Sequence, residues 1–340
     1  MTTNRRAPVN LKPGDDQFFG RFPFQYTLSA SYIKSFQNVV VSELGVPLKN
    51  FRPLKEFIAC YDEDFIKYAF RYALKIFLKT RKVKADGALP FFLIFDNYSG
   101  PNGFFHWISD GLARLIEIKE EINNYTVIVP EYFRDEKFYM DTLSFFDVKN
   151  ILFIAPGTSV KIKKLFISDF IAPSGAFHPQ NAIRLRDFIW SKCSDFTKTS
   201  PAKSRLYISR SKASRRFITN EKEVEILFKE HDFQIIYMED YSFHEQVNIV
   251  YNAQFLAGIH GGALTHIHFM RPDTNVFEFR KKGDGKNNCY YTLADVMKVN
   301  YYYQFCEGVE KSKNANNFDL LVDLEELKDN IQLMIKNSDQ

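Results

Sequence analysis

Residues 205–279 read RLYISRSKASRRFITNEKEVEILFKEHDFQIIYMEDYSFHEQVNIVYNAQFLAGIHGGALTHIHFMRPDTNVFEF. Short apolar runs alternate here with segments whose apolar residues recur at helical spacing, such as Val224, Leu227 and Phe228. The predicted strands cover 205–208, 233–237, 254–259, 275–279 and 301–305, and the predicted helices begin near 220 and cover 242–252, 262–270, 291–298 and 321–335. This alternation indicates βαβ units, and therefore a parallel sheet with helices on both faces.

The first half of the chain is less regular but has the same character. It predicts a long helix over 64–79, a second helix over 179–193, and strands over 91–95, 125–129 and 151–154. We therefore expect an α/β protein with two Rossmann-like domains, whose ligands bind beyond the carboxyl ends of the strands. The expected parts are a flexible tail (1–16), a first domain (17–178), an interdomain helix and linker (179–203), a second domain (204–320) and a C-terminal helix (321–340).

The composition excludes several classes of protein. Of the 340 residues, 45% are apolar and 25% charged, which is typical of a globular protein and excludes disorder for most of the length. A net charge of +4 argues against a nucleic-acid partner. No apolar run is long enough to span a membrane, and the polar start with Arg5 and Arg6 is unlike a secretory signal. The four cysteines are far apart, which indicates neither disulfides nor a zinc site and favours the cytoplasm.

The chain is unusually aromatic, with 35 Phe and 18 Tyr. Most of these side chains are expected in the core, because a chain of this size buries much of its surface. Exposed aromatics would also suit an acceptor groove or a membrane surface.

A loop with three arginines follows the strand at 205–208. Arg210, Arg215 and Arg216 precede a helix, so guanidinium groups and free backbone N–H groups gather at a helix N-terminus. A diphosphate is the natural ligand of such a loop. The alternative is a solvated basic loop in which Thr219 or Asn220 caps the helix.

The strand at 254–259 is followed directly by His260, Gly261 and Gly262. Glycines in this position allow a tight turn and a close approach of the backbone to a ligand. The alternative is that each glycine serves only the turn. The string is similar to an esterase oxyanion loop, but the chain has no G-x-S-x-G nucleophile motif.

Residues 102–115 read NGFFHWISDGLARL, and their spacing predicts a helix with an apolar face. His106, Asp110 and Arg114 share another face, which supplies a candidate general base with a neighbouring carboxylate. A simple surface contact is the alternative. The acidic residues at 62–64 have the form of a metal-binding D-x-D, but we interpret them as the start of a helix.

Together, the three motifs resemble glycosyltransferase family 61, which contains xylosyl-, arabinosyl- and N-acetylglucosaminyltransferases. The matching residues are Phe104, His106 and Asp110, then Ser209, Arg210, Arg216, Ile218, Asn220 and Glu221, and finally His260, Gly261, Leu264, Thr265, Phe269, Pro272 and Glu278. The sequence departs from the family pattern at Gly103, Gly262 and His266, where Asn, Ala and Asn are usual.

The resemblance implies a GT-B architecture, a nucleotide-sugar donor, inversion at the anomeric carbon and no metal. It implies that Asp110 is the catalytic base, with His106 assisting or as second choice, and that Glu278 binds the ribose. It also implies a final helix that crosses back to the first domain. The implied donor-binding residues are Arg210, Arg215, Arg216, Asn220, His260, Gly261, Gly262, Ala263, Leu264, Thr265 and Glu278.

The expected function is therefore transfer of a hexose or pentose from a UDP-sugar to a glycan or lipid-linked glycan. The expected setting is assembly of a surface polysaccharide (capsule or lipopolysaccharide) in the cytoplasm, with peripheral association at the inner face of the membrane. The alternative is a non-catalytic nucleotide- or glycan-binding protein with the same fold, and release of UDP from UDP-sugars would separate the two.

Overall fold

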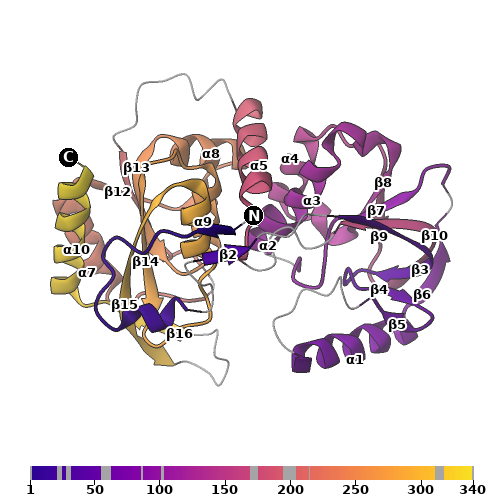
Figure 1. The fold of residues 1–340 in the computed structure, drawn as a ribbon, viewed down its shortest axis with the longest axis horizontal. Helices are drawn as coiled ribbons and strands as arrows, with labels where there is room; N and C mark the ends of the chain where they lie inside the picture. Colours follow the sequence, from indigo (N-terminus) through magenta and orange to yellow (C-terminus); the bar gives the residue numbers. More distant parts are fainter. Residues whose placement is uncertain are drawn as a thin grey trace. The chain divides into compact units, whose positions relative to one another are not determined.

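The computed structural model describes residues 2–20, 25–27, 32–54, 63–85, 87–100, 103–168, 175–193, 204–213, 215–310 and 318–338. The chain divides into two compact units, each with its own sheet (Figure 1). We call Met1–Leu28 together with Arg186–Gln340 the C-terminal unit, and Ser29–Leu185 the middle unit. The prediction of the α/β class is confirmed.

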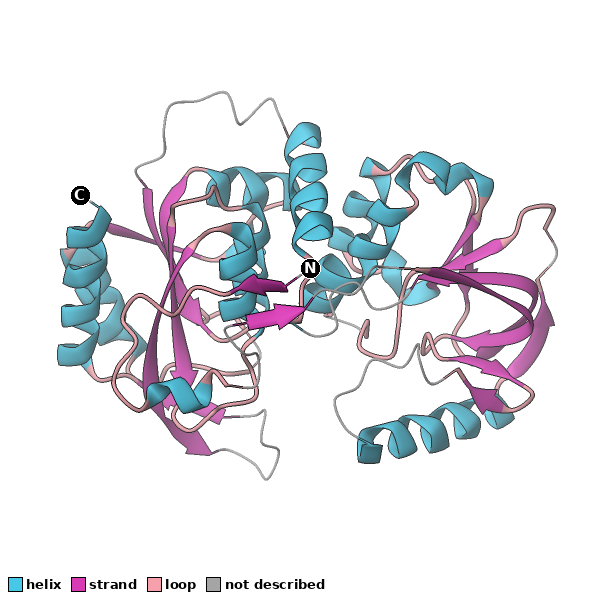
Figure 2. Ribbon diagram, viewed as in Figure 1, coloured by secondary structure: helices cyan, strands magenta, loops and turns pink. Residues whose placement is uncertain are grey.

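The C-terminal unit is built on a six-stranded sheet with the order β12-β11-β13-β14-β15-β16. The strands are β11 (Ser204–Ile208), β12 (Phe233–Ile236), β13 (Ala253–Ile259), β14 (Asn275–Lys281), β15 (Asn300–Glu310) and β16 (Phe318–Leu321). All neighbours are parallel except β15 and β16. The helices are α7 (Glu221–Glu230), α8 (Phe243–Tyr251), α9 (Cys289–Met297), α10 (Leu324–Ser338) and the 3-10 segments η7 (Met238–Asp240) and η8 (Gly262–Phe269). Helices α7 and α10 cover one face of the sheet, and α8 and α9 cover the other (Figures 1 and 2).

Each sequence-predicted strand and helix of this unit is found, because local patterns and caps agree with the tertiary fold. Helix α8, for example, begins with a capping box in which Ser242 and Glu245 satisfy each other's backbone N–H groups. The last helix starts later than predicted, because residues 318–321 pair with β15 as the unpredicted strand β16.

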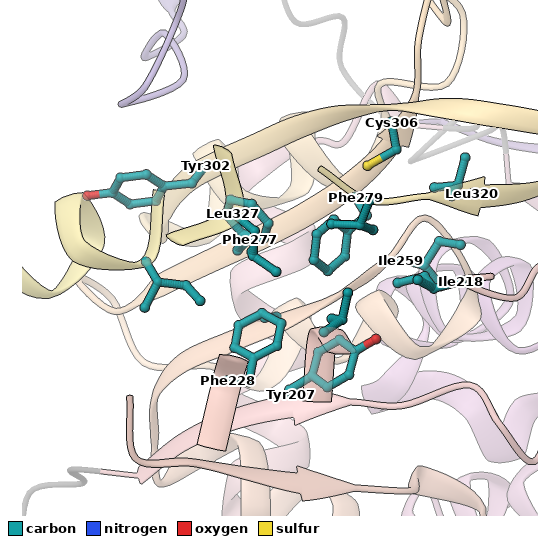
Figure 3. Close-up of a cluster of buried hydrophobic side chains, with 14 of the residues drawn as sticks. Tyr207, Ile218, Phe228, Ile259, Phe277, Phe279, Tyr302, Cys306, Leu320 and Leu327 are labelled. Carbon is teal, nitrogen blue, oxygen red and sulfur yellow. The ribbon is translucent and has the colours of Figure 1, made fainter. Parts of the chain in front are cut away.

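The core between this sheet and the α7–α10 face is rich in aromatic rings (Figure 3). The ring of Tyr207 stacks on Phe228 with 4.5 Å between centroids, and Phe279 packs edge-on against both. Aromatic pairs in such geometries contribute about 0.5–1.5 kcal/mol beyond their buried area. These contacts account for part of the high aromatic content.

The N-terminal segment differs from the prediction. The first 16 residues are not a flexible tail: β1 (Thr2–Asn4) pairs with β2 (Gln25–Thr27), and the backbone N–H of Val9 donates to Tyr301. The buried Phe19 packs against the rings of Tyr291 and Tyr303. The partners of this segment lie at the other end of the sequence, so no local sequence pattern predicts these contacts.

The final helix packs on the core of its own unit. Leu327, Ile331 and Met334 of α10 are buried in the aromatic core of the C-terminal unit itself. The apolar stripe of α10 already has its partner there, next to α7 (Figure 3).

The middle unit contains a sheet with the order β5-β4-β3-β10-β7-β8-β9, in which β6 also pairs with β10. The strands are β3 (Ile33–Ser42), β4 (Pro47–Lys49), β5 (Arg52–Pro53), β6 (Arg81–Lys84), β7 (Phe91–Leu93), β8 (Thr126–Pro130), β9 (Ile151–Ile154) and β10 (Thr158–Ser168). Strands β10, β7, β8 and β9 are parallel, whereas β3, β4 and β5 are antiparallel. The sequence did not predict the long pair β3–β10, which joins segments far apart in the chain and exposes many of its side chains.

The helical segments of the middle unit are α1 (Glu63–Lys79), α2 (Phe104–His106), η3 (Trp107–Gly111), α3 (Leu112–Glu117), η4 (Lys119–Asn124), η5 (Glu131–Arg134) and α4 (Lys137–Phe145); η1 (Asp15–Phe18) belongs to the C-terminal unit. Helix α5 (Pro179–Lys192) contains the boundary between the units, and the predicted linker 197–203 lies outside the described residues. Within the described ranges, no helix has the length and apolar character needed to cross a membrane.

Candidate active site

The chemistry-bearing loops of the C-terminal unit follow β11 and β13, the adjacent strands between which the sheet's connections reverse direction. After β11 the chain goes to β12 on one side, and then returns to β13 on the other. In open α/β sheets, ligands bind at this switch point, beyond the carboxyl ends of the strands. The arginine loop and the His-Gly-Gly turn therefore meet at one place.

Hydrogen bonds to backbone carbonyls hold two arginines of this loop in fixed positions. Arg210 Nε donates to the carbonyl of Arg216 at 3.1 Å, and Arg210 Nη2 donates to the carbonyl of Arg215 at 2.9 Å. Arg216 Nη1 donates to the carbonyl of His260 at 3.1 Å, which ties the arginine loop to the turn after β13. The backbone of Arg216 has a φ of 60°, a left-handed conformation that is uncommon for arginine and costly to hold.

The guanidinium groups at this switch point form no ion pair with a carboxylate of the described residues. Among the described residues, no carboxylate forms an ion pair with Arg210, Arg215 or Arg216, and the buried Nε of Arg216 has no hydrogen-bond partner. Burial, and then the nearby Arg216 charge, lower the pKa of Arg210, and burial lowers the pKa of Arg216. A partly buried cation without a counter-ion is unfavourable, so an anion bound here would stabilise the loop.

The two glycines of the turn have different surroundings. A Cβ atom built on Gly261 would lie 2.9 Å from Nη1 of Arg210, whereas one on Gly262 would meet no atom within 4 Å. Gly261 therefore lets the Arg210 guanidinium lie against the backbone, while Gly262 leaves room for the alanine that is usual in the family pattern.

The buried carboxylate of Glu278 holds the His260 ring in place through a hydrogen bond. The ring's Nδ1 is hydrogen-bonded to Oε1 of Glu278, and the hydroxyl of Tyr301 donates to Oε2 of Glu278 at 2.5 Å. Burial, and then the Glu278 charge, raise the pKa of Tyr301 well above its ordinary value, so the hydroxyl keeps its proton. Glu278 accepts on both oxygens, which requires His260 to carry its proton on Nδ1 and directs Nε2 away from the carboxylate.

Glu278 was expected to bind the ribose. Its side chain is fully buried, and its two oxygens are hydrogen-bonded to His260 and Tyr301. The side chain of His260 itself is 14% exposed.

Other expected donor-binding residues have structural roles. The side chain of Asn220 donates to the carbonyl of Val322 at 2.8 Å and accepts from its N–H at 3.0 Å, and it caps no helix N–H. Leu264 and Thr265 are fully buried in η8. Arg215 is exposed, and its backbone carbonyl accepts a hydrogen bond from Arg210. The backbone carbonyl of Ala263 accepts a hydrogen bond from Nδ1 of His266. Burial lowers the pKa of His266 to about 4, so this residue is neutral near pH 7.

The middle unit carries a second histidine–carboxylate pair. Nδ1 of His106 lies 3.0 Å from Oδ2 of Asp110, as the spacing of four residues predicts. The turn between them, η3, is a π-helix, a rare geometry that is frequent at functional sites. Its shape depends on Gly111, because a Cβ there would lie 2.5 Å from the ring of the fully buried Trp107.

The two members of this pair differ in exposure. The side chain of His106 is 25% exposed and stacks on Tyr98 with 4.8 Å between ring centroids, whereas that of Asp110 is only 3% exposed. Oδ1 of Asp110 is buried and has no partner in the part of the chain that the structure describes. The pair is therefore not a surface contact: the carboxylate lies behind the histidine.

The surrounding charges tune this pair. Burial lowers the pKa of His106, but the hydrogen bond and charge of Asp110, together with the charge of Asp96, outweigh it and raise the pKa above its ordinary value. Burial raises the pKa of Asp110, against the opposing contribution of His106. Arg114, which the spacing placed beside the pair, donates to Oδ2 of Asp96 at 3.1 Å and to the carbonyl of Ile94 at 3.2 Å.

The sequence profile of one family, described as Glycosyltransferase 61, matches residues 104–277, which is half of the chain. The chain belongs to the glycosyltransferase 61 family. No curated protein matches the sequence significantly. The matched range contains His106, Asp110, the arginine loop, His260 and the two glycines that follow it. It ends one residue before Glu278.

Sequence reasoning missed several residues of this glycosyltransferase 61 site. Asp96 lies three residues after the end of the buried strand β7, and this position beyond a strand's carboxyl end was the available signal. Tyr301 had no signal, because it reaches Glu278 from the neighbouring strand β15. Glu63 begins α1, as the helix-start interpretation predicted, whereas Asp62 lies outside the described residues. Within the described ranges, no three His, Cys, Asp or Glu residues gather as a metal site would require.

Proposed function

We propose that this chain is an inverting glycosyltransferase that transfers a sugar from a nucleotide-sugar donor to a hydroxyl group of a glycan. The observation that carries the proposal is the pair of partly buried guanidinium groups, Arg210 and Arg216, without a carboxylate partner at the switch point of the C-terminal sheet. A diphosphate leaving group supplies the missing negative charge, and preorganised donors act most strongly where such charge develops.

The reaction needs one bond made and one broken at the anomeric carbon. The acceptor oxygen attacks this carbon, the bond to the diphosphate oxygen breaks, and the nucleoside diphosphate leaves with the bonding electrons. The acceptor proton goes to a base, and the developing charge on the diphosphate is met by Arg210 and Arg216. Nε2 of His260 faces away from Glu278 and is the third group available to the donor.

We assign the base to His106, which revises the expectation from the sequence. Asp110 is buried behind the imidazole and hydrogen-bonded to Nδ1, so Nε2 of His106 is the basic atom with access to solvent. The carboxylate orients the ring and favours its protonated form after transfer, as in other histidine–carboxylate pairs. Asp110 is thus a positioning residue.

The finer features of the proposal follow the family resemblance. The two units would be the halves of a GT-B enzyme, with the donor on the C-terminal unit and the acceptor on the middle unit. We propose a UDP-sugar donor, no metal requirement, and a role in surface polysaccharide assembly in the cytoplasm, at the inner face of a membrane. Basic side chains would then do what a metal ion does in metal-dependent transferases.

The test is titration of UDP into the purified chain by calorimetry, beside release of UDP from a panel of UDP-sugars with and without chelator. We expect saturable UDP binding, and sugar-specific UDP release that chelator leaves unchanged. Binding without any UDP release, with donor and glycan acceptors present, would favour the non-catalytic binding protein. Activity that depends strictly on Mn²⁺ or Mg²⁺ would contradict the metal-free mechanism.

A further inference from the structure

The hairpin between β4 and β5 ends in an exposed aromatic residue. Lys49 pairs with Arg52 across the hairpin, and the two-residue turn consists of Asn50 and Phe51. Both turn residues have left-handed backbones, with φ values of 50° and 60°. Asparagine tolerates this conformation, but for a bulky residue such as phenylalanine it is strained. The side chain of Phe51 is nonetheless 66% exposed, so burial does not compensate for the strain.

The hairpin tip lies against the C-terminal end of α1, beside β5 (Figure 1). The rings of Phe51 and Phe77 are 5.5 Å apart, edge to face. The next residue, Leu78, is 67% exposed, and Lys79 and Arg81 follow, both exposed. We call the exposed side chains Lys49, Phe51, Arg52, Leu78, Lys79 and Arg81 the hairpin–α1 surface.

This surface is strongly cationic. Residues 65–84 contain seven basic residues and no acidic one, and the hairpin residues 47–54 add Lys49 and Arg52 without an acidic residue. The acidic residues of α1 lie in its first turn, about 24 Å along the helix from Lys79. Glu43, the nearest acidic residue before the hairpin, accepts a hydrogen bond from the backbone N–H of Gly157.

We propose that the hairpin–α1 surface docks on an anionic lipid membrane. Two exposed apolar side chains, Phe51 and Leu78, would enter the headgroup region, and the four flanking cations would contact lipid phosphates. A soluble polyanion would use the cations alone, whereas a lipid surface would also cover the exposed parts of Phe51 and Leu78. The combination of a protruding apolar tip and surrounding cations therefore favours a lipid surface.

This inference does not depend on transferase chemistry, because none of its residues belongs to the candidate active site. It does supply a physical means of peripheral membrane association. Vesicle binding can therefore be absent while donor binding and sugar transfer occur as proposed. Donor binding or transfer can likewise be absent while the chain binds vesicles.

The experiment is sedimentation of the full chain with vesicles of phosphatidylcholine alone, and of phosphatidylcholine and phosphatidylglycerol in equal parts. We expect binding to the anionic vesicles only, and a decrease in binding at high salt. The variant Lys79→Gln/Arg81→Gln is expected to bind about 25-fold more weakly, since each cation near an anionic surface contributes about a fivefold factor.

The apolar contribution is tested with Phe51→Asn, which removes the ring while keeping a residue that tolerates the left-handed turn. We expect this variant to fold normally and to lose most of its vesicle binding. The matched controls lie on α7, where Ile226 is 57% exposed between the exposed Lys222 and Lys229. Ile226→Ser and Lys222→Gln/Lys229→Gln are expected to bind vesicles as the unchanged chain does.

Three results would overturn the proposal: no binding to anionic vesicles, equal binding to both vesicle types, or unchanged binding by Phe51→Asn and Lys79→Gln/Arg81→Gln. Binding to heparin or DNA that needs the cations but not Phe51, without vesicle binding, would identify a polyanion surface instead. UDP titration of the same variants should give the affinity of the unchanged chain.

Discussion

The two units each present a histidine backed by a buried carboxylate, yet the pairs are built differently. His106 and Asp110 lie four residues apart on one helical turn, whereas His260 and Glu278 lie 18 residues apart and meet only because β13 and β14 are neighbours. His260 comes directly after β13, whereas His106 lies in α2, 13 residues after the end of β7.

Their surroundings differ in charge. Beside His260, Arg210 and Arg216 have no carboxylate partner among the described residues, so that site is arranged to receive an anion. Beside His106, the buried Arg114 is neutralised by Asp96. In the proposed mechanism the same pair of side chains serves two purposes: His106 is the base, beside a cation that Asp96 neutralises, and His260 binds the donor, beside cations that form no ion pair.

The largest effect is expected from His106. Replacing it with alanine should lower kcat for sugar transfer by about 10²- to 10⁴-fold, the usual contribution of a general base, and leave UDP affinity unchanged. His244→Ala, at a surface histidine of α8, is the control and should retain full activity. Normal transfer by His106→Ala together with complete loss in Asp110→Asn would return the role of base to Asp110.

The pH profile sharpens the same point. Because Asp110 helps to raise the pKa of His106, the variant Asp110→Asn should lower it. A base must be deprotonated to act, so activity rises with pH through this pKa, and the acidic limb of the kcat profile should move to lower pH in Asp110→Asn. If the acidic limb of the kcat profile does not move in Asp110→Asn, the group that titrates there does not belong to the His106–Asp110 pair.

Arg216 is expected to act mainly on donor binding. A hydrogen bond to a charged group contributes about 1.5–3 kcal/mol, so Arg216→Ala should weaken UDP binding by roughly 10- to 150-fold. Its neighbour Arg215 is exposed and contributes only its carbonyl to the loop, so Arg215→Ala should bind UDP nearly normally. Equal losses in the two variants, measured by calorimetry, would contradict the geometry described here.

Variants of Glu278 test whether this residue acts through His260 or contacts the donor directly. A double-mutant cycle of His260→Ala and Glu278→Gln on UDP affinity should give a coupling of about 0.5–3 kcal/mol, because the two residues act through one hydrogen bond. Glu278→Gln should also leave the ratio of affinities for UDP and 2′-deoxy-UDP unchanged. A collapse of that ratio would restore the ribose-binding role.

The two glycines provide a smaller contrast. Gly261→Ala should push the Arg210 guanidinium from its place and weaken UDP binding by about two- to tenfold, the equivalent of one ordinary hydrogen bond. Gly262→Ala, where a Cβ meets open space, should change neither UDP affinity nor stability. An effect in Gly262→Ala alone would mean that a ligand occupies that space.

Sequence periodicity predicted the parallel strands of the C-terminal unit, the strands β7, β8 and β9 of the middle unit, and most of the helices, because each apolar pattern is local. It failed for β3 and β10, whose partners are distant, and for the first 20 residues, whose buried Phe19 packs on rings from 291 and 303. It also did not predict the partner of Asn220, because the sequence does not distinguish an amide side chain that binds a ligand from one that binds the backbone of Val322.

The sequence by itself determined which residue types follow each strand: the arginine loop, the His-Gly-Gly turn and the His106–Asp110 spacing. Only the tertiary structure decided their roles, because a role depends on which atoms are buried and which are already paired. Burial put Asp110 behind His106, adjacent strands put Glu278 and Tyr301 behind His260, and the arrangement of the loop left Arg210 and Arg216 without an ion pair to a described carboxylate. Burial and pairing come from contacts between distant segments, which a pattern of neighbouring residues does not contain.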